Sequence, residues 1–315
     1  MALTTLYSFC SQGGGNCTDG ELPAGLVQAT NGDFYGTTSS GGANVAPNGA
    51  SAGTIFKITP SGTLTTLYSF CSQSGCTDGY VPDAGLVQAT NGDFYGTTWG
   101  GGVNGEGTVL RITPSGMLTT LYNFCSQPVS GECTDGANPY AALVQATNGD
   151  FYGTTVDGGA NGEGGTVFKI TPSGTLTTLY SFCSRGGAGC TDGESPVAAL
   201  VQDTNGDLYG ATVYGGANTN LNCPSGCGTV FSLSIGLGPF VKTQPTSGTV
   251  GKFVEILGTN LTGATIVTFN GTPATFKVVS RYLITTSVPS GATNGKVQVI
   301  TPSRTLSSNV PFRVP

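Results

Sequence analysis

Hydrophobic and polar residues alternate in one stretch that recurs four times along the chain, at residues 26–38, 86–98, 143–155 and 200–212. The first three copies read LVQATNGDFYGTT and the fourth reads LVQDTNGDLYGAT. An Asn-Gly pair between two short β-prone runs predicts a β-hairpin with a type I′ turn, which needs positive φ at both central residues. Four near-copies indicate a repeat architecture.

Two further apolar runs complete each repeat. Residues 53–59, 107–113 and 165–171 each lead through a Pro-Ser-Gly turn into an LTTLYSF-like run at 64–70, 118–124 and 176–182. The period is 54 to 61 residues, measured between Cys10, Cys71, Cys125 and Cys183. Four antiparallel strands in a repeat of this length are typical of the blade of a β-propeller.

The fourth repeat lacks its last strand. It supplies runs at 200–204, 207–212 and 228–234, whereas residues 3–9 form an LTTLYSF run with no repeat before it. We therefore predict an all-β chain with a four-bladed propeller over residues 1–235, closed by its N-terminal strand, since closure removes exposed sheet edges. An open β-solenoid is the alternative. We expect insertion within one chain, although insertion into a neighbouring chain would form the same hydrogen bonds.

The ten cysteines fall into close pairs, four of which directly precede a Thr-Asp-Gly turn. The gaps vary and the chain has no His, which is unlike a zinc site and favours five local disulfides in an oxidising, extracellular setting. The predicted pairs are Cys10–Cys17, Cys71–Cys76, Cys125–Cys133, Cys183–Cys190 and Cys223–Cys227.

Composition changes near Gly236. After a linker at 236–238, residues 239–315 show short alternating strands punctuated by Gly and Pro, which predict a small β-sandwich. The segments PTSG at 245–248, VEILG at 254–258, VTFNG at 267–271 and GKVQV at 295–299 resemble an IPT/TIG domain, which implies an immunoglobulin-like fold.

The upstream repeats, with NGDFYGTT and GTVFKITPSG, resemble the GloVer-type tandem repeats of secreted bacterial proteins. This resemblance implies an exported, non-enzymatic surface protein and carries no catalytic residues to this chain. Met1-Ala2-Leu3 does not read as a signal peptide, so we expect any export signal or anchor to lie outside the sequence. The sequence has no run of 18 apolar residues, so we predict no membrane span.

The carboxylates are the only candidates for chemistry. One set lies in the Thr-Asp-Gly turns and the other follows the Asn-Gly turns; the residues are Asp19, Asp78, Asp135, Asp192 and Asp33, Asp93, Asp150, Asp207. Because each recurs once per repeat, we expect structural roles, with no catalytic residue, cofactor or metal. Calcium is the weaker alternative, since a DxDxDG-like ligand run is absent.

Charge differs between the two parts of the chain. Residues 1–238 contain 4 Lys+Arg and 16 Asp+Glu, a formal −12, and residues 239–315 contain 7 and 1, a formal +6. The acidic repeats oppose nucleic-acid binding. The opposite signs favour contact between the two parts, within one molecule or head to tail between neighbouring subunits.

Two classes of function remain open. The first is an extracellular structural or adhesive surface protein, as a subunit of a filament or another assembly. The second is a glycan-binding module, in which loop aromatics stack on sugars; the candidates are Tyr80, Trp99, Tyr140 and Tyr214, and packing on neighbouring loops is their alternative role. Asn16, Asn260 and Asn270 stand in Asn-x-Thr sequons and are candidates for glycosylation.

Overall fold

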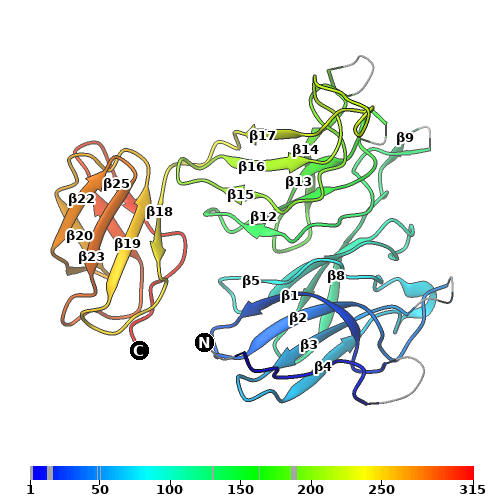
Figure 1. Cartoon of the computed structure of the whole chain (residues 1–315), viewed down its shortest axis with the longest axis horizontal. Coiled ribbons are helices and arrows are strands. Elements are labelled where there is room, and N and C mark those ends of the chain that lie inside the picture. The colour runs from blue at the N-terminus through cyan, green and yellow to red at the C-terminus, as the bar shows by residue number, and fades with distance from the viewer. Residues whose placement is uncertain are drawn as a thin grey trace. The chain divides into compact units, whose positions relative to one another are not determined.

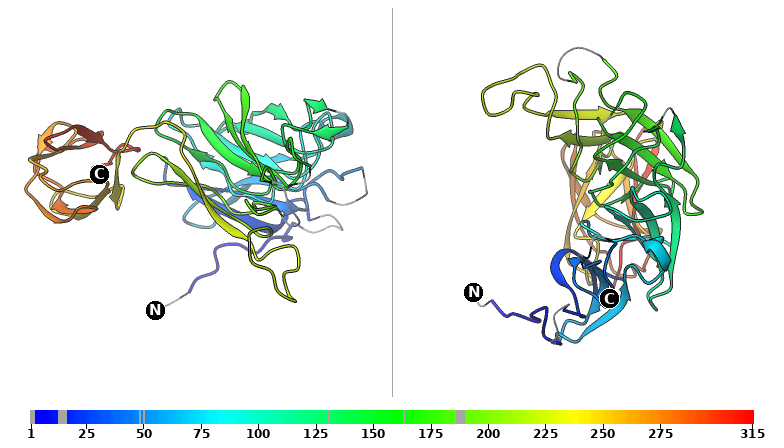
Figure 2. Two further views of the ribbon diagram at one scale, coloured as in Figure 1. Left: turned by 90° about the horizontal axis from the view of Figure 1, so that it is seen from above. Right: turned by 90° about the vertical axis from the view of Figure 1, so that its right-hand side faces the viewer.

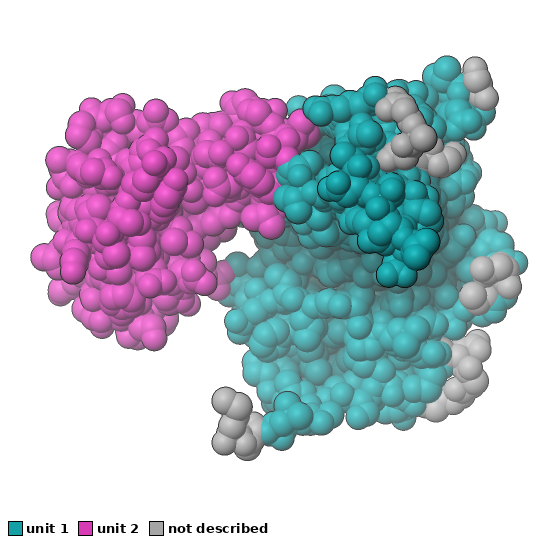
Figure 3. Space-filling model, turned by 45° about the horizontal axis from the view of Figure 1, so that its top comes forward, with its two compact units in different colours: residues 1–145, 149–200, 210–231 teal, residues 146–148, 201–209, 232–315 magenta. Residues whose placement is uncertain are grey.

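The computed structural model is all-β apart from one short 3₁₀ helix, η1 (Ser74–Cys76), among the residues it describes (Figure 1). These residues are 3–12, 17–47, 49, 51–129, 131–162, 164–185 and 190–315. The chain divides into two compact units (Figure 3). Unit 1 comprises residues 1–145, 149–200 and 210–231, and unit 2 comprises residues 146–148, 201–209 and 232–315.

Each of the first three repeats forms one four-stranded antiparallel sheet, which confirms the predicted four-strand repeat. The first sheet contains β1 (Glu21–Gln28), β2 (Phe34–Ser40), β3 (Thr54–Ile58) and β4 (Leu64–Ser69). The second contains β5 (Val87–Gln88), β6 (Phe94–Thr98), β7 (Thr108–Ile112) and β8 (Leu118–Asn123). The third contains β11 (Val144–Gln145), β12 (Phe151–Thr155), β13 (Thr166–Ile170) and β14 (Leu176–Ser181). A small hairpin of β9 (Pro128–Val129) and β10 (Glu132–Cys133) lies in the loop before the third sheet.

The fourth sheet has only three strands, β15 (Val201–Gln202), β16 (Leu208–Thr212) and β17 (Thr229–Leu233). Residues 3–9, which the sequence assigned to its fourth strand, form no strand in the structure. They lie against the first repeat instead, where the ring of Phe9 meets that of Phe56 edge-to-face at 5.0 Å. Figure 2 shows this segment as a trace at the periphery of the repeats. The expected closure of the last sheet is therefore not present in this structure.

The hairpin turns differ from the predicted type. In the first repeat, Gly32 N donates to Ala29 O and Ala29 N donates to Asp33 O, so the loop is longer than two residues. Within each Asn-Gly pair, only the glycine has positive φ, for example +91° at Gly32, and Asn31 does not adopt that conformation. This pattern is a type I turn followed by a glycine bulge, so the predicted type I′ turn is wrong. The Asn side chain instead stabilises the loop, since Asn31 Oδ1 accepts a bond from Asp33 N at 3.1 Å.

The C-terminal part forms two antiparallel sheets around one apolar core, as expected for an immunoglobulin-like sandwich. One sheet contains β18 (Val241–Gln244), β19 (Phe253–Gly258), β23 (Leu283–Ser287) and β22 (Phe276–Ser280). The other contains β21 (Thr272–Pro273), β20 (Ile266–Phe269), β24 (Val297–Ile300) and β25 (Thr305–Ser307). Alternation within β19 explains the packing, because Val254 and Ile256 are buried while Phe253 is exposed.

Unit 2 also contains the hairpin of the fourth repeat, and this hairpin contacts the C-terminal sandwich. Phe240 N donates to Thr204 O at 3.0 Å, and the hydroxyls of Thr204 and Thr259 lie 2.8 Å apart. Lys242 Nζ donates to the carbonyl oxygen of Gln202. The hairpin is thus tied to the domain that follows it.

Candidate functional site

One hydrogen-bond network recurs in the four disulfide loops that precede a Thr-Asp-Gly turn. In the first loop, Asp19 Oδ2 accepts bonds from the hydroxyl of Tyr7 at 2.7 Å and from N and Oγ of Ser11 at 3.0 and 3.2 Å. The equivalent groups are Asp78 with Tyr68 and Ser72, Asp135 with Tyr122 and Ser126, and Asp192 with Tyr180 and Ser184. This set of carboxylates therefore stabilises the loop that carries it.

These bonds also set the protonation of the groups. Burial alone would raise the pKa of Asp19, but the bonds from Tyr7 and Ser11 outweigh it, and the pKa lies below its ordinary value. Burial and the bond to Asp78 raise the pKa of Tyr68 to about 12. A carboxylate held ionised by its neighbours is not poised to exchange protons near neutral pH, so the network does not read as an acid–base pair.

The second set of carboxylates pairs with cations on the third strand of each sheet. Asp33 lies 3.8 Å from Lys57, Asp93 lies 3.8 Å from Arg111, and Asp150 lies 3.9 Å from Lys169, measured between charged atoms. Ser232 stands at the cation's position in the fourth repeat. Partly exposed pairs of this kind contribute little stability and bring no group into a shared site.

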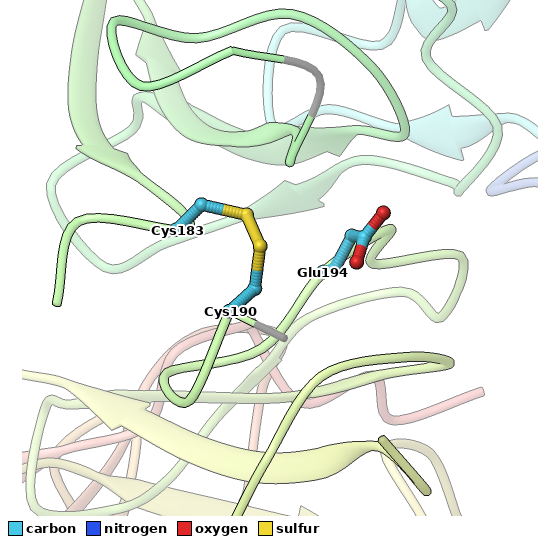
Figure 4. A group of neighbouring side chains, drawn as sticks. All are labelled: Cys183, Cys190 and Glu194. Atoms are coloured by element: carbon cyan, nitrogen blue, oxygen red, sulfur yellow. A yellow bond between two sulfur atoms is a disulfide. The ribbon is translucent and has the colours of Figure 1, made fainter. Parts of the chain in front are cut away.

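All five predicted disulfides are present. Among the described residues, a single group of metal-ligand type gathers, consisting of Cys183, Cys190 and Glu194 (Figure 4). Its two sulfur atoms are bonded to each other, so neither is available as a thiolate ligand. The group therefore does not fit a metal site.

The candidate loop aromatics divide into two kinds. The rings of Trp99 and Tyr140, from successive repeats, meet edge-to-face at 6.0 Å, and Tyr80 lies against Gly100, where a Cβ atom would come within 2.5 Å of the ring. Tyr140 and Tyr214 remain exposed. The structure thus brings Trp99 and Tyr140 together and leaves part of Tyr140 exposed.

The sequon asparagines lie on the surface where the structure describes them. Asn260 and Asn270 are exposed, and the side-chain amide of Asn270 donates to Thr293 Oγ1 at 2.9 Å. Asn16 lies outside the described residues.

A surface depression of about 490 Å³ runs along β14, lined by residues 176–181 together with Gln127, Thr134 and Ala160. Tyr180 is its one titratable group, and its hydroxyl is bonded to Asp192 at 2.7 Å. The other polar side chains of the lining are those of Gln127, Thr134, Thr177, Thr178 and Ser181.

Successive repeats pack face to face through stacked rings. Tyr35 of the first repeat stacks on Phe94 of the second at 4.1 Å, and Tyr95 of the second stacks on Phe151 of the third at 4.0 Å. Two hydrogen bonds accompany the first contact: Thr30 N donates to Gln88 Oε1 at 2.9 Å, and Thr37 Oγ1 donates to Ala84 O at 2.8 Å. We call the side that a repeat turns toward the next repeat its forward face, and the opposite side its backward face.

The same faces are exposed at the two ends of the array. On the forward face of the fourth repeat, Val230 is 83% exposed, whereas its equivalents Val109 and Val167 are at most 1% exposed. On the backward face of the first repeat, Leu26 is 63% exposed, whereas its equivalent Leu86 is 7% exposed. Sequence analysis identified the missing strand but not these two faces; the signal for them was the position of Val230 and Leu26 in the first and last copies of a buried pattern.

These features define a β-repeat protein with disulfide-closed loops and a C-terminal sandwich. The family model of the Gloeobacter/Verrucomicrobia repeat matches residues 1–220 and 129–272, and the IPT/TIG domain model matches residues 240–314. The chain therefore belongs to the Gloeobacter/Verrucomicrobia repeat family and ends in an IPT/TIG domain, which confirms both resemblances.

Solved structures show only distant likeness. A glycosyl hydrolase from Bacteroides ovatus is 11% identical with a TM-score of 0.34, over 69% of this chain and 66% of that one. A fungal alcohol oxidase in complex with copper is 13% identical with a TM-score of 0.32, over 91% of this chain and 75% of that one. No curated protein matches the chain.

Five disulfides are consistent with an extracellular or secreted protein. Within the part of the chain that the structure describes, none of the helices is long and apolar enough to cross a membrane.

Proposed function

We propose that this chain is a non-enzymatic extracellular surface protein with a structural or adhesive role, as a subunit of a filament or another assembly. The observation that carries the proposal is the role of the carboxylates. Those of the Thr-Asp-Gly turns, such as Asp78, accept hydrogen bonds within their own loop, and those after the Asn-Gly turns, such as Asp33, pair with a cation on the same sheet. Residues that recur once per repeat in this way build a scaffold, whereas an active site gathers different groups at one place.

We also propose that the four repeats act as the blades of a β-propeller whose last blade is completed by an LTTLYSF strand of residues 3–9. The support is the equivalence of this run with β4, β8 and β14, each of which forms the fourth strand of its sheet. Completing the last sheet would cover the open edge of β17.

Labelling of intact source cells tests the surface role. Antibody raised against the purified chain, detected by immunogold electron microscopy on unpermeabilised cells, is expected to label material outside the cell envelope. Label that requires permeabilisation would overturn the proposal. Antibody against a cytoplasmic protein serves as the control for cell integrity.

Glycan binding is the second candidate, favoured by the contact of Trp99 with the exposed Tyr140 across two repeats. Aromatic faces on neighbouring loops are a common platform for the apolar face of a sugar. On a glycan array, the native chain is expected to bind at least one glycan and the Trp99→Ala chain to lose that binding. Equal binding by both chains would assign these rings to packing alone.

A further inference from the structure

We infer that residues 3–9 of one copy form the fourth strand of the β15–β17 sheet of a second copy, linking subunits head to tail. The inference rests on the proposed structural role and deepens it, because it names the partner and the surface. The donor is the LTTLYSF run, and the acceptor is the open edge of β17 (Thr229–Leu233) together with the forward face of the fourth repeat.

The acceptor strand β17 resembles the third strands of the complete sheets, each of which pairs with a fourth strand. In the first three repeats, the third strand pairs on one side with the second strand and on the other with an LTTLYSF-like strand. β17 carries the matching sequence TVFSL but ends its sheet. Val230 of β17 is exposed, whereas the residue at the equivalent position is buried in each complete repeat. An unpaired strand with an exposed apolar side chain is a ready template for another strand.

The donor has the sequence of an outer strand but belongs to no sheet. Leu3 is 98% exposed, and residues 3–9 pair with no strand in the described part of the chain. The segment is nevertheless fixed on the first repeat by the bond from Tyr7 to Asp19 and by the Cys10–Cys17 disulfide. Its contact between Phe9 and Phe56, at 5.0 Å, matches that between Phe124, the residue after β8, and Phe168 of the following repeat, at 5.2 Å.

The segment therefore occupies the position of an outer strand that belongs to a repeat in front of the first one. A Cβ atom on Gly62 would lie 2.6 Å from Leu6 O, just as one on Gly116 would lie 2.9 Å from Leu67 O of β4. The missing repeat needs three strands with a free outer edge and an exposed forward face. The fourth repeat of a second copy has both features.

A second copy meets this need without rearrangement of the chain. Residues 3–9 and residues 229–231 of β17 both belong to unit 1. The interfaces between repeats in this unit contain fully buried, stacked rings such as those of Tyr95 and Phe151. These interfaces are formed while residues 3–9 pair with no strand and β17 ends its sheet, so this structure shows no insertion into the same chain. A second copy leaves them intact and continues the series of repeats, which is a heterologous contact that generates filaments.

The complete repeats give the register of the proposed pairing. Lys169 of β13 stands opposite Thr177 of β14, and Lys57 stands opposite Thr65 in the first sheet. By equivalence, Ser232 of one copy stands opposite Thr4 of the next. Opposed Cβ atoms in antiparallel strands lie about 5 Å apart, close enough for an engineered disulfide after small adjustments.

The test uses the full chain with Thr4→Cys and Ser232→Cys in one molecule, under mild oxidation at raised protein concentration. A ladder of covalent multimers that collapses on reduction is the expected result on a denaturing gel. A mixture of the two single variants is expected to give covalent dimers containing one of each chain. Thr4→Cys with Ser303→Cys, which places the second thiol on an exposed loop of the sandwich, is the control for random cross-linking and should give no ladder.

Two results would overturn the inference. A monomer with an internal disulfide between positions 4 and 232 and no ladder would mean that the strand inserts into its own chain. Cross-linking no greater than in the control would mean that residues 3–9 do not pair with β17 at all. Either result leaves the surface role standing if cells are labelled externally, whereas a ladder from a chain that is labelled only inside cells would remove the surface role alone.

Discussion

The hydroxyl of Tyr68 donates a 2.8 Å hydrogen bond to Oδ2 of Asp78, across the loop closed by the Cys71–Cys76 disulfide. Asp78 is fully buried, and the same carboxylate oxygen also accepts bonds from N and Oγ of Ser72. The tyrosine lies on the last strand of one sheet and the aspartate lies on the way to the next sheet. This single bond therefore couples the outer strand to the chain crossing between repeats.

Replacement of Tyr68 by Phe should destabilise the protein. Loss of a hydrogen bond to a buried charged group costs roughly 1.5–3 kcal/mol in the free energy of unfolding. Urea unfolding followed by circular dichroism measures this change. Tyr140→Phe, at an exposed site, is the matched control and should change the free energy of unfolding by less than about 0.5 kcal/mol. Equal stability of the two variants would mean that the Asp78 network does not hold the loop.

Alkaline pH should also destabilise the fold. Burial, together with the bond to a carboxylate, raises the pKa of Tyr68 and of Tyr122 from 10.0 to about 12. The folded chain therefore keeps these protons at a pH where the unfolded chain has lost them. The stabilisation is complete below pH 10 and is lost as the pH rises toward 12.

The midpoint of thermal unfolding, measured from pH 9 to pH 12, should fall over that interval. Absorbance at 295 nm should show late ionisation of tyrosines that include Tyr68 and Tyr122. In the Tyr68→Phe, Tyr122→Phe double variant, the midpoint starts lower at pH 9 and should fall less steeply. A parallel decline in both proteins would contradict the assignment to these two tyrosines.

Local sequence pattern predicted the strands of the repeats well. β2, β3 and β4 fall within the runs at 33–38, 53–59 and 64–70, apart from two added residues at the end of β2. The reason is that period-two alternation and turn residues act over a few positions, so they are readable in one chain. Disulfide pairing was predictable for the same reason, because each pair closes a short loop.

Long-range features were less accessible from the sequence. The side chain of Asn31 bonds to Asp33 N and its backbone does not adopt positive φ, and the dipeptide Asn-Gly alone does not distinguish this bulged turn from a type I′ turn. The placement of residues 3–9 depends on which face of another repeat is free. Sequence equivalence shows what strand Thr229–Leu233 needs but not which molecule supplies it.

Equivalent valines should respond differently to truncation. Val167 is 1% exposed, so Val167→Ala should cost about 2 kcal/mol through lost burial and a cavity. Val230→Ala removes exposed methyl groups, so unfolding of the dilute chain should change by less than about 0.5 kcal/mol.

The Val230→Ala chain should nevertheless assemble less well, because the proposed partner covers this side chain. Light scattering over a concentration series measures assembly, and urea unfolding at low concentration measures stability. A loss of dilute stability at Val230 as large as that at Val167 would mean that the forward face of the fourth repeat is already covered within one chain.

Removal of residues 1–9 tests the role of the N-terminal strand in a different way. The deletion takes away the ring of Phe9 from Phe56 and the hydroxyl of Tyr7 from Asp19. The buried Asp19 carboxylate then loses a charge-assisted bond, and the apolar surface of the first repeat becomes exposed. The thermal midpoint should therefore fall by several degrees, measured by circular dichroism.

Aggregation of the truncated chain should rise because the edge of β17 stays open. The aggregates should be disordered because no donor strand is left to link the subunits in order. Addition of a synthetic peptide with the sequence of residues 3–9 should suppress this aggregation, whereas a scrambled peptide of the same composition should not. A truncated chain as stable and soluble as the full chain would show that neither the first repeat nor β17 requires this strand, and the open solenoid would then be the better description of the repeats.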